Sequence, residues 1–229
     1  MDYTNPELNR WSVDTYHIRA SIVRELKAAL PHMHGSLLDV GCGRSPYKPL
    51  LTNHRSRVTR YTGLDIPSPQ YATQPDVSWD GGRIPLDDGL FDTAVATEVL
   101  EHSPDPQSLL NEICRVLRPG GFFFMTVPYL WPLHDIPYDH FRYTPFSLER
   151  MLTNARFSRT ELRATGGWDA SLATMLGLWV RRRPVGPRWE GILARLAFPV
   201  YKMLINRDRP PQTFDKSVMI TGLAASAWK

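Results

Sequence analysis

Two stretches of this sequence carry residue types that could do chemistry together. Residues 39–43 read Asp-Val-Gly-Cys-Gly behind an apolar run. Glycines at this spacing let a chain turn tightly and bring bare backbone close to a ligand. Residues 134–145 hold two histidines, two aspartates and two tyrosines. Because imidazole titrates near neutral pH, this second stretch could take a proton from a substrate.

The glycine turn needs a buried strand before it and a helix after it. Residues 37–40 suit a central parallel strand. Ser45 and Pro46 suit the cap and first position of a helix that ends near Leu51, whose N-terminus would attract an anion. A dinucleotide fingerprint wants glycine or alanine at position 46, so nicotinamide or flavin binding is disfavoured. Alone, the turn is also compatible with a plain strand-to-helix connection.

The composition is that of an ordinary globular protein. Its 229 residues suit one domain, and a hydrophobic content of 42% suffices for a packed core. The charged N-terminus does not resemble a secretory signal, and no apolar run reaches the ~20 residues that span a bilayer. Two cysteines make no disulfide framework. We therefore expect a cytoplasmic protein, with a membrane-peripheral location as the alternative.

Elements that alternate between strand and helix must position the two stretches. Apolar repeats predict a helix over residues 14–30 and another after Asp105, and Thr144 is a predicted helix cap. Alternation of this kind is typical of a parallel sheet between helices, which makes the chain α/β. The predicted strands after the glycine turn are residues 61–66, 77–80, 91–97, 122–127, 156–165 and 217–227.

Asp65 comes about one βαβ step after the glycine turn, at the end of the second predicted strand. A carboxylate at that strand end can accept two hydrogen bonds from a ribose diol. As an isolated residue it would be interpreted as a strand-end turn acid. Its spacing from the glycine turn favours the ribose interpretation.

Four motifs in order resemble a class I S-adenosylmethionine-dependent methyltransferase of the small Rossmann-like type, over roughly residues 35–165. They are Asp39-Val40-Gly41-Cys42-Gly43; Gly63-Leu64-Asp65; Asp80 with Ile84-Pro85-Leu86 and Phe91-Asp92; and Glu98-Val99-Leu100-Glu101-His102 with Val116-Leu117-Arg118-Pro119-Gly120-Gly121. The resemblance implies a three-layer sandwich around a seven-stranded, mostly parallel sheet with an antiparallel final strand. A helical insertion would precede that strand.

The resemblance also implies a cofactor, S-adenosylmethionine, whose product is S-adenosylhomocysteine. Asp39 and the glycine backbone would hold its methionine end, and Asp65 its ribose. Asp80 would accept from the adenine amino group. Nucleic-acid amino-methyltransferases have Asn/Asp-Pro-Pro-Tyr/Phe where this chain has residues 97–100, which argues against them. The implied cofactor-binding residues are Asp39, Gly41, Cys42, Gly43, Asp65, Ile66, Asp80, Gly81, Thr97 and Glu98.

The loop at residues 134–143 follows the fifth predicted strand, so we expect it over the edge where the methyl group would point. His140 and His134 are the predicted general bases, and Asp139 could orient or replace them. Alternatively, Arg142 and Asp139 merely pair and pin the loop. His134, Asp135, Asp139 and His140 are also metal-ligand types, but we assign no metal.

A basic insertion over about residues 167–215 separates the last two predicted strands. Residues 178–209 carry a net charge of +6, which leaves −2 for the rest of the chain. The insertion is interpreted as a lid or a homodimer face. A basic, aromatic surface over residues 172–207 that contacts a membrane is the alternative. The prediction is one methyltransferase domain, residues 1–229, with an N-terminal helical cap at residues 1–34.

We expect O-methylation of a small molecule, and a sugar or glycolipid acceptor is favoured over nucleic acid. N- or C-methylation of a natural product is the second option. The alternative of another class is a regulatory or scaffold protein that binds the cofactor without transferring methyl. The proton-accepting residues of the loop speak against that alternative.

Overall fold

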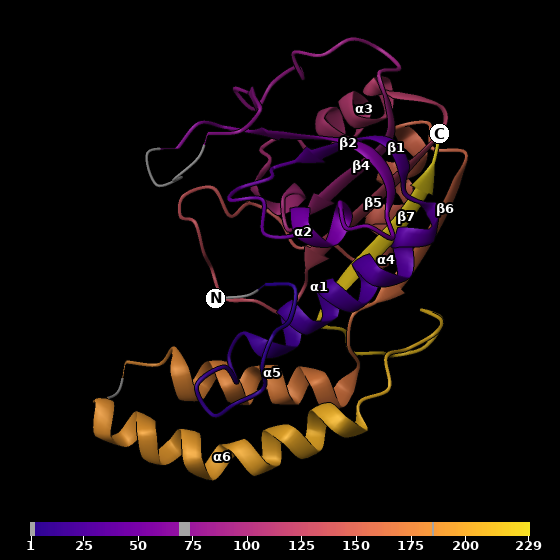
Figure 1. Cartoon of the computed structure of the whole chain (residues 1–229). Helices are drawn as coiled ribbons and strands as arrows, with labels where there is room; N and C mark the ends of the chain where they lie inside the picture. Colours follow the sequence, from indigo (N-terminus) through magenta and orange to yellow (C-terminus); the bar gives the residue numbers. More distant parts are fainter. Residues whose placement is uncertain (1–2, 69–73, 185) are drawn as a thin grey trace.

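A seven-stranded sheet forms the centre of the computed structural model, which describes residues 3–68, 74–184 and 186–229 (Figure 1). The first two residues of the predicted cap and residue 185 of the predicted insertion lie outside the described residues. The strand order is β3-β2-β1-β4-β5-β7-β6. The strands are β1 (His34–Val40), β2 (Arg57–Asp65), β3 (Val77–Ser78), β4 (Phe91–Thr97), β5 (Leu117–Pro128), β6 (Arg159–Ala164) and β7 (Gly222–Trp228).

The first five strands pair in parallel, and β7 runs antiparallel to both β5 and β6. This confirms the predicted fold class, including the antiparallel final strand. The central strands are apolar on both faces because helices cover both sides. Side chains alternate between the faces, so Phe123 packs in one core cluster while Phe122 and Phe124 pack in the other.

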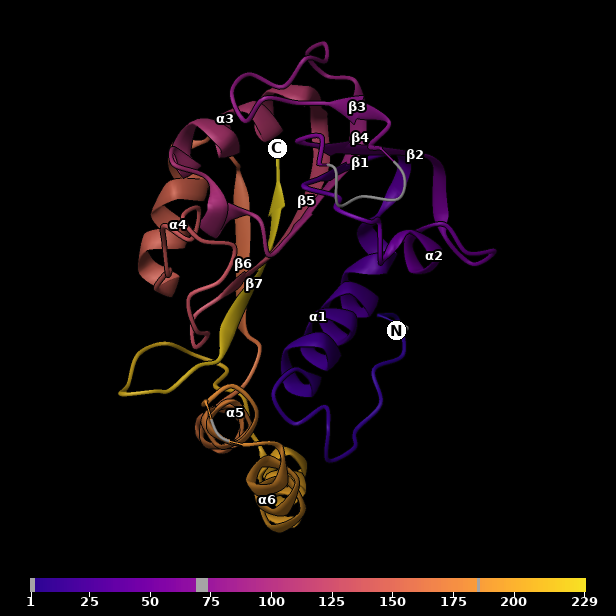
Figure 2. The same cartoon turned by 90° about the vertical axis from the view of Figure 1, so that its left-hand side faces the viewer.

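Helices form a layer on each face of the sheet (Figure 2). Helices α1 and α2 lie on one face and α3 and α4 on the other. The predicted caps are confirmed: Asp105 Oδ1 accepts from Ser108 N at 3.1 Å, and Thr144 begins α4 with a capping box. The helices are α1 (Tyr16–Ala29), α2 (Lys48–Leu51), α3 (Pro106–Val116), α4 (Pro145–Asn154), α5 (Trp168–Arg181) and α6 (Pro187–Arg207), with 3₁₀ turns at Leu30–His32 and Leu100–His102.

Three local predictions were wrong. The helix after the glycine turn begins at Lys48 rather than Pro46, and Ser45 has a φ of 50° instead of capping it. With only four residues, this helix has no aligned run of dipoles to attract an anion. The predicted helix over residues 14–30 begins only at Tyr16, after Asp14, whose Oδ2 accepts from Arg182 Nε at 2.7 Å. Strand β5 begins at Leu117 rather than at residue 122, because Leu117 already pairs with Phe91 before the register shifts.

Helices α5 and α6 lie side by side beyond one end of the sheet (Figures 1 and 2). Strand β6 runs parallel to β5, since both are antiparallel to β7, so it delivers α5 to the carboxyl edge of the sheet. A small core joins both helices to the N-terminal segment through Val13, Ala173 and Tyr201. A Cβ at Gly177 would lie 2.0 Å from Val13 O, so only glycine permits this close approach. In the part of the chain described here, no helix is long and apolar enough to cross a membrane.

Candidate functional site

The glycine turn follows β1 and is fixed by backbone bonds to β2. Gly41 N and Cys42 N both donate to Leu64 O, at 2.8 and 3.1 Å. Gly41 and Gly43 have φ values of +66° and +56°, a region that side chains rarely tolerate. A Cβ at Gly41 would lie 2.5 Å from Val99 Cγ2, whereas a Cβ at Gly43 would meet nothing within 4 Å. Gly41 is therefore needed for packing, and Gly43 leaves its backbone facing open space.

Asp65 ends β2 beside this turn, as predicted. Its Oδ2 accepts from Gly43 N at 2.5 Å and its Oδ1 from Ile66 N at 2.7 Å. Its carbonyl accepts from Trp79 N at 2.9 Å, which anchors the segment after β3. The carboxylate is thus held at the carboxyl edge next to exposed glycine backbone.

Asp39 is buried at the end of β1 and is paired with a residue that the sequence did not single out. Tyr61 Oη donates to Asp39 Oδ2 at 2.5 Å. Burial raises the pKa of Asp39 to about 7, although the Tyr61 bond opposes this shift. The neighbouring Cys42 is also buried, and burial raises its thiol pKa to about 12. A thiol with that pKa is a packing group rather than a nucleophile.

The remaining predicted cofactor residues line the ends of neighbouring strands. Asp80 is exposed and its Oδ1 accepts from Gly82 N at 2.9 Å. Gly81 has a φ of +88°, and a Cβ there would lie 3.7 Å from the exposed Ile66 side chain. Thr97 ends β4. Glu98 follows with a φ of 56°, and burial raises its pKa to about 7.

A cavity of about 420 Å³ opens beside Gly43, between α2 and residues 74–76. Only Gly43 of the ten predicted cofactor residues lines it. The other predicted cofactor residues lie at or just after the ends of β1, β2, β3 and β4. This cavity therefore adjoins the candidate site without containing it.

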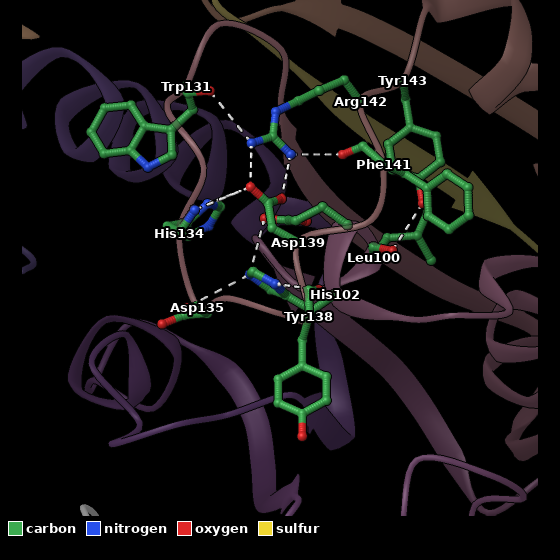
Figure 3. Close-up of polar contacts among 11 residues, drawn as sticks. Leu100, His102, Trp131, His134, Asp135, Tyr138, Asp139, Phe141, Arg142 and Tyr143 are labelled. Atoms are coloured by element: carbon green, nitrogen blue, oxygen red, sulfur yellow. Dashed lines mark hydrogen bonds and ion pairs between the residues drawn. The ribbon is translucent and has the colours of Figure 1, made fainter.

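Loop 129–143 is organised around Asp139 (Figure 3). The Arg142 guanidinium donates to both carboxylate oxygens, at 2.5 and 2.8 Å. His134 approaches Oδ2 through its backbone N and its Nδ1, each at 3.2 Å. The Asp139 side chain is only 2% exposed, and Arg142 holds its pKa far below the usual range. Asp139 therefore pins the loop and orients His134.

His134 faces a second histidine, His102, from the turn after β4 (Figure 3). Their ring centroids are 4.7 Å apart in an edge-on arrangement. His102 Nδ1 lies 3.2 Å from Tyr138 O. Glu101, beside His102, has a fully buried carboxylate, and neither of its oxygens has a hydrogen-bond partner among the described residues. Burial raises the pKa of Glu101 well above its usual range, and the nearby Glu98 adds to the shift.

His140 lies outside this group. Its side chain is exposed, and its backbone N donates to Glu101 O at 2.9 Å. The structure thus places His134 and Asp139 together, whereas the exposed His140 ring packs near Phe141. The sequence places Glu101 and His102 in a family motif without assigning them to the site, although they follow the fourth predicted strand at the edge where the site was expected.

Comparisons with known proteins relate part of the chain to methyltransferases. Residues 38–125 match a family model described as a methyltransferase domain. A fatty-acid O-methyltransferase of Mycolicibacterium smegmatis is 33% identical over 141 residues, which are 57% of this chain and 47% of the relative. The chain thus spans about half the length of that relative. An uncharacterized methyltransferase of Mycobacterium sp. (strain KMS) is 29% identical over 70% of this chain and 71% of its own.

Solved structures share the fold over nearly the whole chain. A SAM-dependent methyltransferase from Thermotoga maritima, described as a possible histamine N-methyltransferase, aligns with a TM-score of 0.59 and 15% identity. The alignment covers 96% of this chain and 93% of that one. At this identity the likeness concerns the fold alone.

Proposed function

Because the chain belongs to the class I S-adenosylmethionine-dependent methyltransferases, we propose that it transfers the methyl group of S-adenosylmethionine to an acceptor hydroxyl at loop 129–143. One observation carries the proposal. The glycine turn with Asp65 and the histidine group of the loop lie at the same carboxyl edge of one sheet. Ligands of open α/β sheets bind at this edge.

The residues at the glycine turn fit the cofactor. The open backbone at Gly43 allows close approach, and the Asp65 carboxylate is oriented for a ribose diol. Asp39 offers a carboxylate to the cationic amino group at the methionine end. When bound, the cofactor supplies a methyl group on a positively charged sulfur.

The chain's own part is to position the acceptor and to promote loss of its proton. The hydroxyl oxygen forms the new C–O bond as the C–S bond breaks, which leaves S-adenosylhomocysteine and releases one proton. We assign the promotion of that deprotonation to His134, because Asp139 orients its ring. His140 is the weaker choice, since its ring is exposed and its ring contact among the described residues is with Phe141.

The outer faces of the helix pair α5–α6 support an amphiphilic acceptor at a membrane surface. Each helix carries a stripe of apolar side chains at helical spacing that are between 46% and 68% exposed. Exposed cations, among them Arg188, Arg195 and Lys202, accompany the α6 stripe. Apolar and basic side chains together fit the surface of an anionic bilayer. The stripes are Trp168, Leu172, Met175 and Trp179 on α5, and Trp189, Ile192, Leu196, Val200 and Met203 on α6.

The fatty-acid O-methyltransferase among the relatives agrees with an amphiphilic acceptor, because its named substrate is a lipid. A sugar attached to a lipid would be both a glycan acceptor, as the sequence favours, and a ligand that the apolar and basic faces of α5 and α6 could meet at a membrane. N- or C-methylation of a natural product and a non-catalytic cofactor-binding role remain the competing hypotheses. Methylation of an acceptor oxygen, identified by mass spectrometry, separates the proposal from both.

Calorimetric titration with S-adenosylhomocysteine tests the cofactor site. We expect micromolar binding, weakened about 10–100-fold in Asp65→Ala, since each ~1.4 kcal/mol is tenfold. Asp105→Ala, which removes a helix cap on the opposite face, is the matched control and should bind like wild type. Equal affinity of Asp65→Ala and wild type would contradict the assignment.

A screen of sugar, glycolipid and fatty-acid acceptors tests the transfer. With an acceptor in hand, His134→Ala should lower kcat about 100-fold or more and leave cofactor affinity unchanged. His140→Ala should keep most of the activity. The reverse pattern would move the assignment to His140.

Vesicle sedimentation tests the membrane contact. We expect binding to anionic vesicles that salt weakens, and loss of it in Leu172→Ser/Leu196→Ser. Phe146→Ser, which alters a 66% exposed residue of α4, should bind normally. A wild-type dimer that the double variant converts to monomer, without vesicle binding, would assign the stripes to a second copy of the chain.

A further inference from the structure

We propose that Glu101, His102 and His134 form a binding site for a divalent transition-metal ion at the acceptor edge. One nitrogen or oxygen from each residue lies within 4.8 Å of the other two. The cation binding is independent of methyl transfer. Its catalytic role rests on the proposed function and deepens the assignment of His134.

Hydrogen bonds on the far side of each ring fix the two histidines as metal ligands. Asp139 is held as a carboxylate by Arg142, so His134 Nδ1 must carry the hydrogen that it directs at Asp139. Tyr138 O can only accept, so His102 Nδ1 carries a hydrogen as well. Both Nε2 atoms therefore hold lone pairs. Metal-binding histidines in proteins usually show this pattern of a carboxylate or carbonyl behind the ring.

Glu101 supplies the third ligand and the strongest reason for a cation. Its carboxylate is fully buried, and neither oxygen has a hydrogen-bond donor among the described residues. Its Oε1 lies 3.8 Å from His102 Nε2, too far for a hydrogen bond. An isolated carboxylate is costly to bury unless it is paired or binds a metal. A cation between the three side chains would supply the partner that the buried carboxylate lacks.

The ligand types and geometry favour a transition metal. Two imidazole nitrogens and one carboxylate oxygen suit Zn²⁺, Co²⁺ or Mn²⁺ better than Ca²⁺, which prefers oxygen alone. Bonds of about 2.1 Å place tetrahedral ligands about 3.4 Å apart, so the three side chains need to close by roughly an ångström. Three protein ligands leave a coordination position open.

The open position explains how His134 would promote deprotonation. An acceptor hydroxyl bound there has a lowered pKa, loses its proton to water, and attacks as an alkoxide or phenolate. His134 then acts through the cation rather than as a free base. Asp135, whose carboxylate is 78% exposed and 3.9 Å from His102 Nε2, borders this position and adds negative charge.

Titration of the metal-free protein with Co²⁺, followed by visible absorption, tests the site without cofactor or acceptor. We expect d–d bands of a four- or five-coordinate ion with 1:1 stoichiometry, and their loss when Zn²⁺ is added. Glu101→Gln and His102→Ala should each weaken binding at least about 100-fold, and Asp139→Asn about 10–100-fold. S-adenosylhomocysteine affinity equal to wild type shows that these variants are folded.

His140→Ala is the matched control, because it removes an exposed histidine of the same loop that is outside the set. It should bind Co²⁺ like wild type. Absence of Co²⁺ binding in wild type, or binding that survives in Glu101→Gln and His102→Ala, would overturn the proposal. Methyl transfer that persists unchanged in chelator-treated protein would overturn the catalytic role and leave the proposed function standing.

Discussion

The glycine turn and loop 129–143 lie at the same edge of the sheet but are held by different forces. The turn is fixed by backbone hydrogen bonds and by glycine conformation over a few consecutive residues. The loop is fixed by side chains, chiefly the ion pair of Asp139 with Arg142 and the imidazole that it orients. One region presents bare backbone, and the other presents titratable groups.

The loop region also contains two buried carboxylates in opposite situations. Asp139 has charged and polar donors on both oxygens, whereas Glu101 has none among the described residues. A paired buried carboxylate maintains structure, whereas an unpaired one is costly to bury and is a candidate ligand for a cation. The difference separates the residue that positions the site from the residue that we assign to a ligand.

The largest effect is expected at the glycine turn. Gly41→Ala should lower the free energy of unfolding by about 4 kcal/mol, because φ is +66° and the new Cβ meets Val99 at 2.5 Å. Gly43→Ala should cost only about 1 kcal/mol, since its Cβ meets nothing, yet it should weaken S-adenosylhomocysteine binding. Urea denaturation and calorimetry measure both. Equal destabilisation by the two changes would refute this division of roles.

The next effect distinguishes the two buried carboxylates. Asp139→Asn should destabilise the protein by about 3 kcal/mol, because Arg142 loses its buried partner. In metal-free protein Glu101→Gln should change stability by less than about 1 kcal/mol, since no hydrogen bond of the carboxylate is lost. Thermal and urea unfolding of chelator-treated, metal-free protein measures the stability of both variants. A large loss in Glu101→Gln would mean that this carboxylate already has a structural partner.

The sequence predicted the strand ends and helix caps better than the side-chain contacts that bring the loop residues together, for a physical reason. Strand ends, Asp65 and the caps at Asp105 and Thr144 follow from residue types a few positions apart. The hydrogen bond from Tyr61 to Asp39 joins β2 to β1. The pairing register of these two strands cannot be inferred from residues that are neighbours in the sequence. Glu101 and His102 come from one element and His134 from a distant loop, so only folding shows that they converge. The start of α2 at Lys48 was also predicted wrongly. The left-handed conformation of Ser45 depends on the glycine turn before it, and the sequence pattern does not show this conformation.

A third prediction concerns His17, which lies buried on α1 with its Nε2 2.9 Å from Thr221 Oγ1. Burial lowers its pKa to about 4. The folded protein therefore binds this proton less readily than the unfolded chain does. The stabilisation is complete above about pH 6.5 and falls by roughly 2–3 kcal/mol as the pH drops to about 4. His17→Gln should remove this slope from the stability profile between pH 7 and pH 4, and an unchanged slope would assign it to other groups.

The smallest effect is expected at the hydrogen bond between Tyr61 and Asp39, beside the glycine turn. Tyr61→Phe removes the hydrogen bond that Tyr61 of β2 donates to the Asp39 carboxylate, and should cost about 1 kcal/mol of stability. The same bond lowers the pKa of Asp39, which stands at about 7, so its loss should raise that pKa.

If the Asp39 carboxylate holds the cationic end of the cofactor, S-adenosylhomocysteine affinity should fall as the pH drops through about 7 in wild type. In Tyr61→Phe the midpoint of that fall should move to higher pH. Calorimetric titrations from pH 6 to pH 9 measure the shift. Asp39 is adjacent to the glycine turn and separate from the histidines of the loop. The variant His134→Ala should therefore keep the wild-type pH midpoint of S-adenosylhomocysteine affinity. A pH midpoint that moves only in His134→Ala would mean that the glycine turn and loop 129–143 are coupled through the bound ligand.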